Sequence, residues 1–495
     1  MDITKPISNI FPYPDSIVRT KTYGAYNLLL EGAHYEAFTI QAEKGFTQRY
    51  ARLRYITCNF AGLVSKVIAD ILFGEEIQII TENNQEWLED LYFTNQIQTL
   101  NYESSMSNSA KGDALYKIRI ENGEIKIDDI NPAIYFPHLD PSNPRKKPTV
   151  EELAWTEEVS KDKYLLREIH SPGFVTTMCN EVDEKGNIGL NVSIEDYNKL
   201  ANTNYIDSVE TGIKQNLLVH VPNFRYSGHY WGVSDYQDIE GLMFAVNNRM
   251  TKTDNILDKH SDPILAVPEG VLDENGQVKK EAFGMIEMKN KDGVKPEYIV
   301  WNANLDSAFK EVDKLVEFMF MFSETSPDVL GMGKGQAESG RALKMRLIRT
   351  LAKRNRKQLY YDQALREVFY ICQLLSKAKG YTVNGSKVKD EPTVPFLKWP
   401  DGVINDVVED TDVEVTKVAA GLISKKRSIM KLEGVEEDEA VAIIEEISQE
   451  KKSNVAAFGL PVKPAAVDTK VNDQANSNNT IDKDKQVKDK KQFEK

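Results

Sequence analysis

The hydrophobic positions change their period several times along the chain, and each change predicts an element. Apolar side chains at helical spacing predict an early group of helices, the first of which ends at the stop signal Gly74. From residue 114 the pattern alternates as in strands, and strand signals separated by polar turns continue to about residue 222. The predicted helices span residues 53–73, 85–95 and 96–112. The pattern over residues 1–233 therefore predicts an α+β domain.

A different pattern follows, with two long apolar stripes on either side of a β-rich segment. The first predicts a helix over residues 234–260, capped by Ser234 or Asp235, which would be about 40 Å long at about 1.5 Å per residue. The second predicts a helix from residue 304 to 323. Short strands and polar turns fill residues 264–301. Two long helices with a small β insert between them are unusual for a compact enzyme domain.

The last part of the chain begins with a loop and ends in a polar tail. Four glycines and a proline over residues 326–340 predict a mobile loop. Beyond it we expect a long helix, a β segment and a final helical unit, at residues 341–379, 381–399 and 411–452. From Asp468 onward the sequence is polar and of mixed charge, which predicts disorder.

Composition narrows the class of protein. The chain has 495 residues, of which 41% are hydrophobic, enough to build hydrophobic cores. Its formal net charge of −14 argues against a protein that coats nucleic acid by charge alone. No apolar run is long enough for a membrane helix, and the N-terminus lacks a signal pattern. The three cysteines are far apart, which favours a reducing compartment.

The sequence offers no motif for a cofactor, a metal or a nucleophile. The glycine-rich loop fails the phosphate-binding pattern twice, because Gly333-Lys334 is followed by Gly335 and residue 328 is Asp. The six histidines are dispersed, and Cys372 lies among apolar helical positions, as a core residue does. We therefore expect no catalytic residue, no cofactor and no metal.

The strongest charge signal is an acid-free basic stretch at the start of the long helix 341–379. Its cations are Arg341, Lys344, Arg346, Arg349, Lys353, Arg354, Arg356 and Lys357. Two interpretations remain open at this point. The helix could have a solvated basic face or pair with acidic neighbours in an oligomer, or it could contact a nucleic-acid backbone.

Four segments between about residues 50 and 450 occur in an order that carries a resemblance. They are Asn59–Gly74 with Glu75; the helix, β insert and helix at 234–323; Ser323-Glu324-Thr325-Ser326-Pro327 leading to Ser339-Gly340-Arg341-Ala342-Leu343-Lys344; and Phe396–Gly402 followed by Gly421–Ser424. In this order the chain resembles the portal proteins of tailed bacteriophages, especially the branch from long-tailed phages of Gram-positive hosts.

The resemblance implies a portal-type α+β subunit. Its expected parts are a wing (1–233 and 341–402), a two-helix stem (234–260 and 302–325), a clip (261–301), a tunnel loop (326–340), a helical crown (403–452) and a disordered tail (453–495). The expected tunnel-loop residues are Asp328, Gly331, Gly333, Lys334, Gly335 and Glu338. The candidate docking residues of the clip are Glu269, Asp273, Glu274, Lys279 and Lys280.

The resemblance also implies a function without catalysis. Such proteins form a ring, usually of twelve subunits, at one capsid vertex of the virion, and they are assembled in the host cytoplasm. Double-stranded DNA passes through the ring. The ring docks the terminase large subunit and head-completion or adaptor proteins, and it contacts the major capsid and scaffolding proteins. No membrane partner is expected. The alternatives are a nucleic-acid-processing enzyme, with the basic helix as its platform, and a scaffold or adaptor that forms no channel.

Overall fold

The computed structural model describes residues 5–41, 55–261, 264–266, 297–299, 305–333, 340–400, 402, 407–435 and 437–457. The chain divides into two compact units, an N-terminal unit of Met1–Asn405 and a C-terminal unit of Asp406–Lys495. Within the described ranges, the N-terminal unit contains all the sheets, together with several helices, and the C-terminal unit is helical. This mixture confirms the predicted α+β class.

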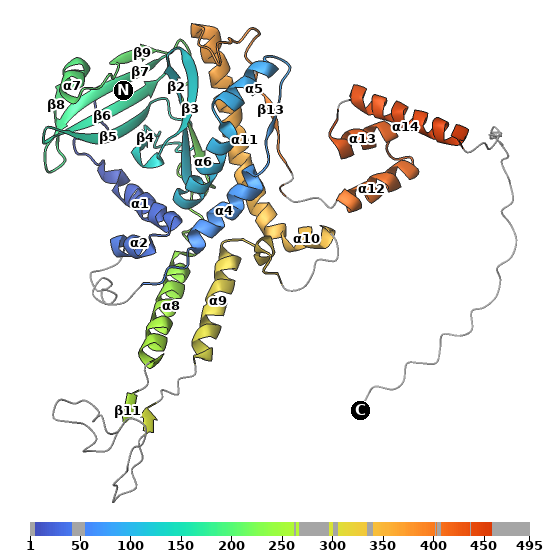
Figure 1. The fold of residues 1–495 in the computed structure, drawn as a ribbon. Helices are drawn as coiled ribbons and strands as arrows, with labels where there is room; N and C mark the ends of the chain where they lie inside the picture. Colours follow the sequence, from blue (N-terminus) through green and yellow to red (C-terminus); the bar gives the residue numbers. More distant parts are fainter. Residues whose placement is uncertain are drawn as a thin grey trace, which may run out of the picture. The chain divides into compact units, whose positions relative to one another are not determined.

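A group of helices occupies the start of the N-terminal unit (Figure 1). They are α1 (Ile17–Glu31), α2 (His34–Gln41), α4 (Phe60–Phe73), α5 (Gln85–Thr94) and α6 (Ile97–Lys111). The side chain of Asn59 begins α4 by accepting a hydrogen bond from the backbone N–H of Gly62 at 2.8 Å. The predicted start at residue 53 is wrong for residues 55–59, because residues 55–58 precede the cap Asn59 and none of the five is helical. The predictions of α5 and α6 are confirmed to within one residue at each end.

The predicted strands form antiparallel sheets. The largest sheet has six strands in the order β4-β5-β6-β7-β8, with β9 paired to β7, and a second sheet has the order β10-β2-β3. Their bounds are β2 (Asp113–Glu121), β3 (Glu124–Asp129), β4 (Tyr135–Pro137), β5 (Glu151–Val159), β6 (Asp162–Ser171), β7 (Phe174–Val182), β8 (Ile188–Val192), β9 (Ser208–Glu210) and β10 (Leu218–Pro222). The predicted turns at Gly173 and at residues 183–187 join β6 to β7 and β7 to β8, and a short helix, α7 (Ile194–Ala201), follows β8.

The two predicted long helices are present as α8 (Glu240–Ser261) and α9 (Asp306–Phe322). They pack along each other through Met243, Val246, Val312, Leu315 and Met319. Beyond them, β11 (Ile264–Ala266) pairs with β12 (Glu297–Ile299) in antiparallel fashion. Figure 1 shows the two helices running together from the rest of the unit to this strand pair.

The predicted cap of α8 at Ser234 or Asp235 is wrong, because the helix begins at Glu240. Ser234 instead accepts a hydrogen bond from the backbone N–H of Tyr236 at 3.0 Å, and the backbone N–H of Asp235 donates to the carbonyl oxygen of Ser109 at 2.9 Å. The chain is therefore held in turns before the helix starts. With 22 residues, α8 is about 33 Å long rather than about 40 Å.

The longest helix, α11 (Ile348–Lys379), lies against the core of the N-terminal unit. A short helix, α10 (Gly340–Arg346), precedes it with a break at Leu347. Tyr361, Leu365 and Phe369 of α11 are buried in the cluster that α4, α5, α6 and β2 also line. The predicted β segment over 381–399 contains one named strand, β13 (Phe396–Lys398), which pairs with β1 (Gln78–Ile80).

The C-terminal unit consists, in its described residues, of α12 (Val407–Ala419), α13 (Lys425–Glu433) and α14 (Glu437–Ala457). Ser424 caps α13 by accepting a hydrogen bond from the backbone N–H of Arg427. The buried carboxylate of Glu414 accepts from Lys417 at 2.9 Å and from Lys431 at 2.7 Å, which joins α12 to α13. The predicted tail boundary at residue 453 is too early, because α14 continues to Ala457; residues 458–495 lie outside the described part.

Candidate functional site at the junction of α8, α9 and α11

A buried carboxylate joins the start of α8 to the basic stretch of α11. The side chains of Lys353 and Lys357, one helical turn apart, both face Asp235. The Nζ of Lys357 lies 2.6 Å from Oδ2, and the Nζ of Lys353 lies 3.2 Å from Oδ1. All three side chains are 6% exposed or less. We call these three residues the Asp235 cluster.

Two neutral groups complete the surroundings of this carboxylate. The hydroxyl of Ser109 on α6 donates to Oδ2 at 2.5 Å, and the side-chain amide of Asn223 donates to Oδ1 at 3.0 Å. Burial alone would raise the pKa of Asp235, but the charges of Lys353 and Lys357 outweigh burial and hold the pKa below its usual range. Burial lowers the pKa of Lys357 to about 8, against the attraction of Asp235. The cluster thus holds two amines on one carboxylate.

The chain that leaves α9 is fastened to α11 through backbone groups. The Nζ of Lys353 donates to the carbonyl oxygen of Ser323 at 2.9 Å. The hydroxyl of Thr350 donates to the carbonyl oxygen of Glu324 at 3.1 Å and accepts from the backbone N–H of Ser326 at 2.8 Å. Glu324 has a positive φ of 55°, so the chain turns sharply here in a conformation that non-glycine residues seldom adopt. These bonds fix the direction in which the chain enters the glycine-rich loop.

Ion pairs reinforce the same connection. The carboxylate of Glu324 accepts from Arg349 at 2.5 Å and also from Arg356, one α11 cation on each oxygen. Asp328, at the start of the loop, pairs with Arg346 at 3.4 Å. These contacts involve residues with partly exposed side chains, so each pair contributes little energy by itself. Together with the Asp235 cluster they join the segment before α8, the end of α9 and the start of the loop to α10 and α11.

The structure thereby places most of the predicted basic residues. Lys353 and Lys357 are buried and paired within the chain, which corrects the interpretation of a solvated basic face or a DNA contact for these two positions. Arg354 is buried as well, and it donates to Gln358 at 2.8 Å and to the carbonyl oxygen of Pro400. Lys344 is exposed, and the side chain of Arg341 lies outside the described residues.

The described half of the predicted tunnel loop is ordered around Asp328. Residues Pro327–Leu330 form a 3-10 turn capped by the side chain of Ser326, and Gly331 ends the turn with a φ of +68°. A Cβ on Gly333 would lie 1.9 Å from Oδ1 of Asp328, so only glycine fits there without a shift. The other loop residues, Lys334, Gly335 and Glu338, lie outside the described residues, as do Glu269, Asp273, Glu274, Lys279 and Lys280 of the predicted clip.

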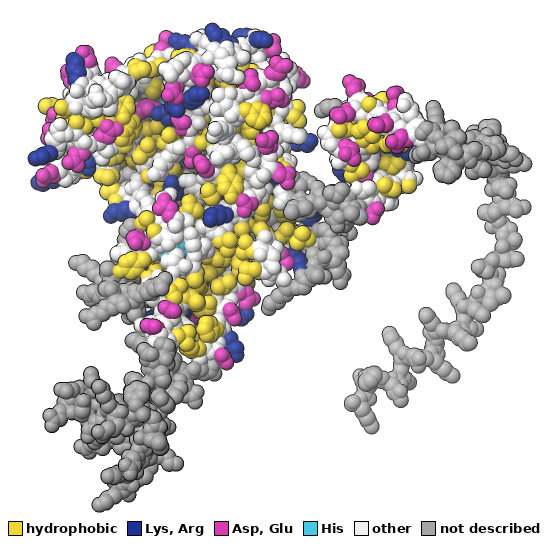
Figure 2. Space-filling model, viewed as in Figure 1, with side chains coloured by type: hydrophobic (Ala, Val, Ile, Leu, Met, Phe, Trp, Pro, Cys, Tyr) yellow, Lys and Arg dark blue, Asp and Glu magenta, His cyan; other side chains and the backbone are white. Residues whose placement is uncertain are grey.

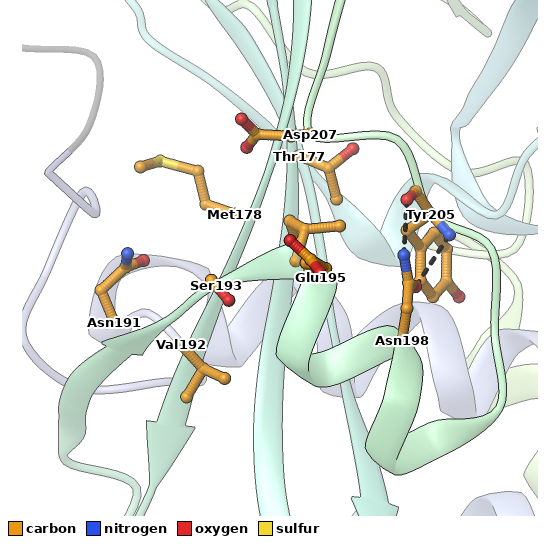
Figure 3. A pocket seen from close by; sticks show the side chains of 10 residues that line it. Thr177, Met178, Asn191, Val192, Ser193, Glu195, Asn198, Tyr205 and Asp207 are labelled. Carbon is orange, nitrogen blue, oxygen red and sulfur yellow. Dashed lines mark hydrogen bonds between the residues drawn. The ribbon is translucent and has the colours of Figure 1, made fainter.

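A separate hollow of about 590 Å³ lies where β7 and β8 meet α7 (Figure 3). The side-chain amide of Asn198 donates to the carbonyl oxygen of Tyr205 at 2.7 Å, and its Oδ1 accepts from the Tyr205 backbone N–H at 2.9 Å. Ser193 caps α7 through the backbone N–H of Asp196. The polar groups at this edge therefore hold the loop after α7, and the hollow shows no convergent set of reactive groups.

Some acid–base pairs that the sequence did not indicate are buried in the sheets. His220 lies 2.6 Å from Asp113, and Arg167 forms an ion pair with Glu152 at 2.9 Å with both side chains buried. Within the described ranges, no group of three or more His, Cys, Asp or Glu side chains could hold a metal ion. In the same ranges, no helix is both long and apolar enough to span a bilayer. Cys372 is fully buried, which confirms its prediction as a core residue.

A comparison with family models gives one match, over residues 33–455, to the model described as phage portal protein, SPP1 Gp6-like. The chain belongs to this phage portal protein family. Portal proteins are structural parts of the virion, so the membership agrees with the expected absence of an enzyme function and with the expected portal fold. No curated protein matches the chain.

Solved structures of gene transfer agent particles are similar to this portal chain at low identity. A chain of the virion of a native gene transfer agent particle has a TM-score of 0.43 and 13% identity, with 87% of this chain and 96% of that chain covered. A chain of the neck of an empty particle, computed with C6 symmetry, has a TM-score of 0.45 and 11% identity over 75% of this chain and 88% of that one. A neck chain of a native particle, computed with C12 symmetry, has a TM-score of 0.36 and 14% identity over the same shares.

Proposed function

We propose that this portal protein forms a closed ring of twelve subunits at one vertex of the capsid, and that double-stranded DNA enters and leaves through the ring. Membership of the portal family over residues 33–455 carries this proposal. The pair of long helices α8 and α9 supports it, because a repeated helix pair gives a stiff wall for a channel. The subunit has no catalytic role in this proposal.

The parts of the subunit are assigned as follows in this proposal. Residues 1–233 and 341–402 form the wing, α8 and α9 the stem, 261–301 the clip, 326–340 the tunnel loop and 403–452 the crown. The division of the chain near Asn405 fits a separate crown. The β11–β12 pair at the far end of the stem fits a small β-rich clip, which would dock the terminase large subunit and head-completion proteins.

The charge distribution fits a passage through which DNA must move. Each phosphate neutralised by a Lys or Arg releases counterions and adds to the free energy of binding, and the contacts of all subunits in a ring would add up, so affinity would rise steeply with their number. The chain carries a net charge of −14. Several cations of its most basic segment already pair with Asp235, Glu324 and Asp328 of the same chain. Few cations of that segment are then left to retain DNA.

The wider setting follows from the same assignment. The protein would belong to the branch found in long-tailed phages of Gram-positive hosts, would assemble in the host cytoplasm and would contact capsid and scaffolding proteins. The alternatives are a scaffold or adaptor without a channel and a nucleic-acid-processing enzyme. No observation on the described residues favours either of them.

The test is the mass and symmetry of the purified full-length chain, by native mass spectrometry and negative-stain class averages. We expect closed rings of about twelve copies with a central hole. A monomer or dimer across a range of salt concentrations would contradict the proposal. Divalent-dependent cleavage of DNA by the purified chain would instead revive the enzyme alternative.

A further inference from the structure

A cavity of about 330 Å³ opens beside the Asp235 cluster, and its walls are of two kinds. Phe224, Met321 and Phe322 form an apolar side, and Arg349 and Arg356, with Lys353 and Lys357 of the cluster, form a cationic side. Asp235, Asp238 and Glu324 also line it, so four cations face three carboxylates. We call this feature the junction cavity.

The apolar side extends beyond the cavity as an exposed rim. The ring of Phe224 meets that of Tyr226 edge to face with centroids 5.8 Å apart, and the rings of Phe318 and Phe322 lie 6.3 Å apart. Tyr226 and Phe322 are each 54% exposed, and Met321 is 59% exposed. Figure 2 shows hydrophobic side chains gathered over the region of α8 and α9. Large apolar side chains that are contiguous on a surface mark an interaction site.

The rim lies at the C-terminal end of α9, where side chains stay exposed within the described part of the N-terminal unit. Val312, Leu315 and Met319 turn toward α8, and Phe320 is buried with them. Phe318, Met321 and Phe322, close to this stripe at the end of α9, remain at least 42% exposed. With Arg349 and Arg356 of α11 the surface combines aromatic rings, a thioether and arginines, which is the composition found at the centres of protein interfaces.

We propose that the junction cavity and its rim receive the neighbouring copy of this chain in the ring, which inserts an apolar side chain next to a carboxylate. The inference rests on the proposed ring. In a ring of identical subunits the contact is heterologous, so each subunit presents one face to a different face of its neighbour. The lining of the cavity has four cations against three carboxylates, whereas the whole chain carries a net charge of −14, so a second copy is on balance opposite in charge to the lining. A nucleic-acid backbone fits less well, because the exposed apolar rim offers nothing to phosphates.

The experiment compares ring formation by the full chain and its variants, using native mass spectrometry. Phe322→Asp and Met321→Asp should weaken subunit association at least tenfold, and Phe322→Leu should assemble as the wild type does. Leu190→Asp on β8 is the matched control, because Leu190 is 76% exposed and far along the chain from the cavity. Rings of Phe322→Asp equal to those of the wild type would overturn the inference, and so would an equal loss in the Leu190→Asp control.

A second measurement does not depend on how well a charged variant folds. A photo-reactive benzophenone amino acid in place of Phe322 should give covalent dimers of the chain on irradiation of the rings. Rings without such dimers would overturn the inference. Rings of Phe322→Asp that form normally but lose binding of a 30-base-pair DNA would overturn it in favour of a nucleic-acid site. Failure of the wild-type chain to form any ring would instead contradict the proposed function itself.

Discussion

Replacing Asp235 by Asn tests whether the Asp235 cluster holds the N-terminal unit together. The amide keeps the shape of the side chain but removes the only anion that contacts Lys353 and Lys357 in the described structure. Breaking a buried ion pair on one side costs about 3–5 kcal/mol, because an uncompensated charge stays buried. The amide nitrogen would also face donors from Ser109 or Asn223. We therefore expect the free energy of unfolding to fall by about 3–5 kcal/mol.

Lys357→Met supplies the matched comparison. This variant leaves Lys353 as one amine on the one carboxylate of Asp235. It replaces the buried amine of Lys357, which has a pKa lowered by burial to about 8, with an apolar side chain of similar length. We expect a loss of less than about 2 kcal/mol, since replacing part of a buried ionic group by apolar atoms is often tolerated. The double variant should be more stable than Asp235→Asn alone, because only one amine then lacks its anion.

Tryptophan fluorescence during urea unfolding is a suitable assay. All five tryptophans, Trp87, Trp155, Trp231, Trp301 and Trp399, lie between residues 1 and 405, so the signal reports the N-terminal unit. Glu324→Gln serves as the control for a partly exposed ion pair and should cost less than about 1 kcal/mol. An Asp235→Asn unfolding free energy within about 1 kcal/mol of the wild type would refute the reasoning, as would a double variant less stable than Asp235→Asn.

Three further outcomes follow from individual residues. Burial raises the pKa of Asp129 to about 7, and its Oδ1 lacks a hydrogen-bond partner within the described structure. Asp129→Asn should therefore stabilise the unit at pH 8 by up to about 4 kcal/mol in urea unfolding, with no gain near pH 3, below the unfolded-state pKa of about 3.9. Burial lowers the pKa of Lys357 from its ordinary value of 10.5 to about 8, so the wild type should gain about 3 kcal/mol relative to Lys357→Met as the pH rises from 8 to 10.5. A flat difference between the two would contradict this. Gly333→Ala would force the side chain of Asp328 aside and strain the loop, so an assay of DNA packaging should show a defect. Gly241→Ala is the control and should package normally, because a Cβ there meets nothing within 4 Å.

Elements with local signals were predictable from the sequence. The hairpin of β2 and β3 turns at Asn122 and Gly123, both with positive φ, and alternation on either side of the turn already indicated it. The helix α6 ends at Gly112 with a φ of +90°, as glycine at a helix end suggests. Turn and cap residues act over a few positions, so these predictions needed no knowledge of the tertiary structure.

Elements that depend on distant partners were missed or misplaced. The strand β1 was missed, and β13 is only three residues of the β segment predicted over 381–399. The two strands pair Ile79 with Leu397, and at three residues each neither carries a recognisable pattern alone. The helix α8 starts late because Asp235 is bonded to the hydroxyl and the carbonyl oxygen of Ser109 on α6 and to Lys357 on α11. Nothing near Asp235 in the sequence indicates these contacts. The helices α1 and α2 were not predicted, because the hydrophobic positions of residues 17–41 gave no clear stripe.

The same limit applies to the candidate site. The basic stretch was visible in the sequence, and Asp328 was named beside it, but the pairing of α11 with Asp235 and Glu324 is tertiary. An acid-free run of cations has two physical explanations, a polyanionic ligand or acids that come from other elements. A buried lysine argues for the second, because desolvation of an ammonium is tolerated only when a carboxylate of the same fold compensates it. The exposed fractions of Lys353 and Lys357, and not their charge, therefore distinguish the two explanations.

This arrangement also bears on how the loop could respond to passing DNA. We infer that the loop cannot move as an independent hinge at its α9 end, because residues Ser323 to Asp328 bond to α11 through Lys353, Thr350, Arg349 and Arg356, and to α10 through Arg346. A displacement of Asp328 would pull on Arg346 before α11, and a displacement of Glu324 would pull on α11 one turn from the Asp235 cluster, which holds the start of α8. Motion of Glu324 would then reach both α8 and α9 through α11.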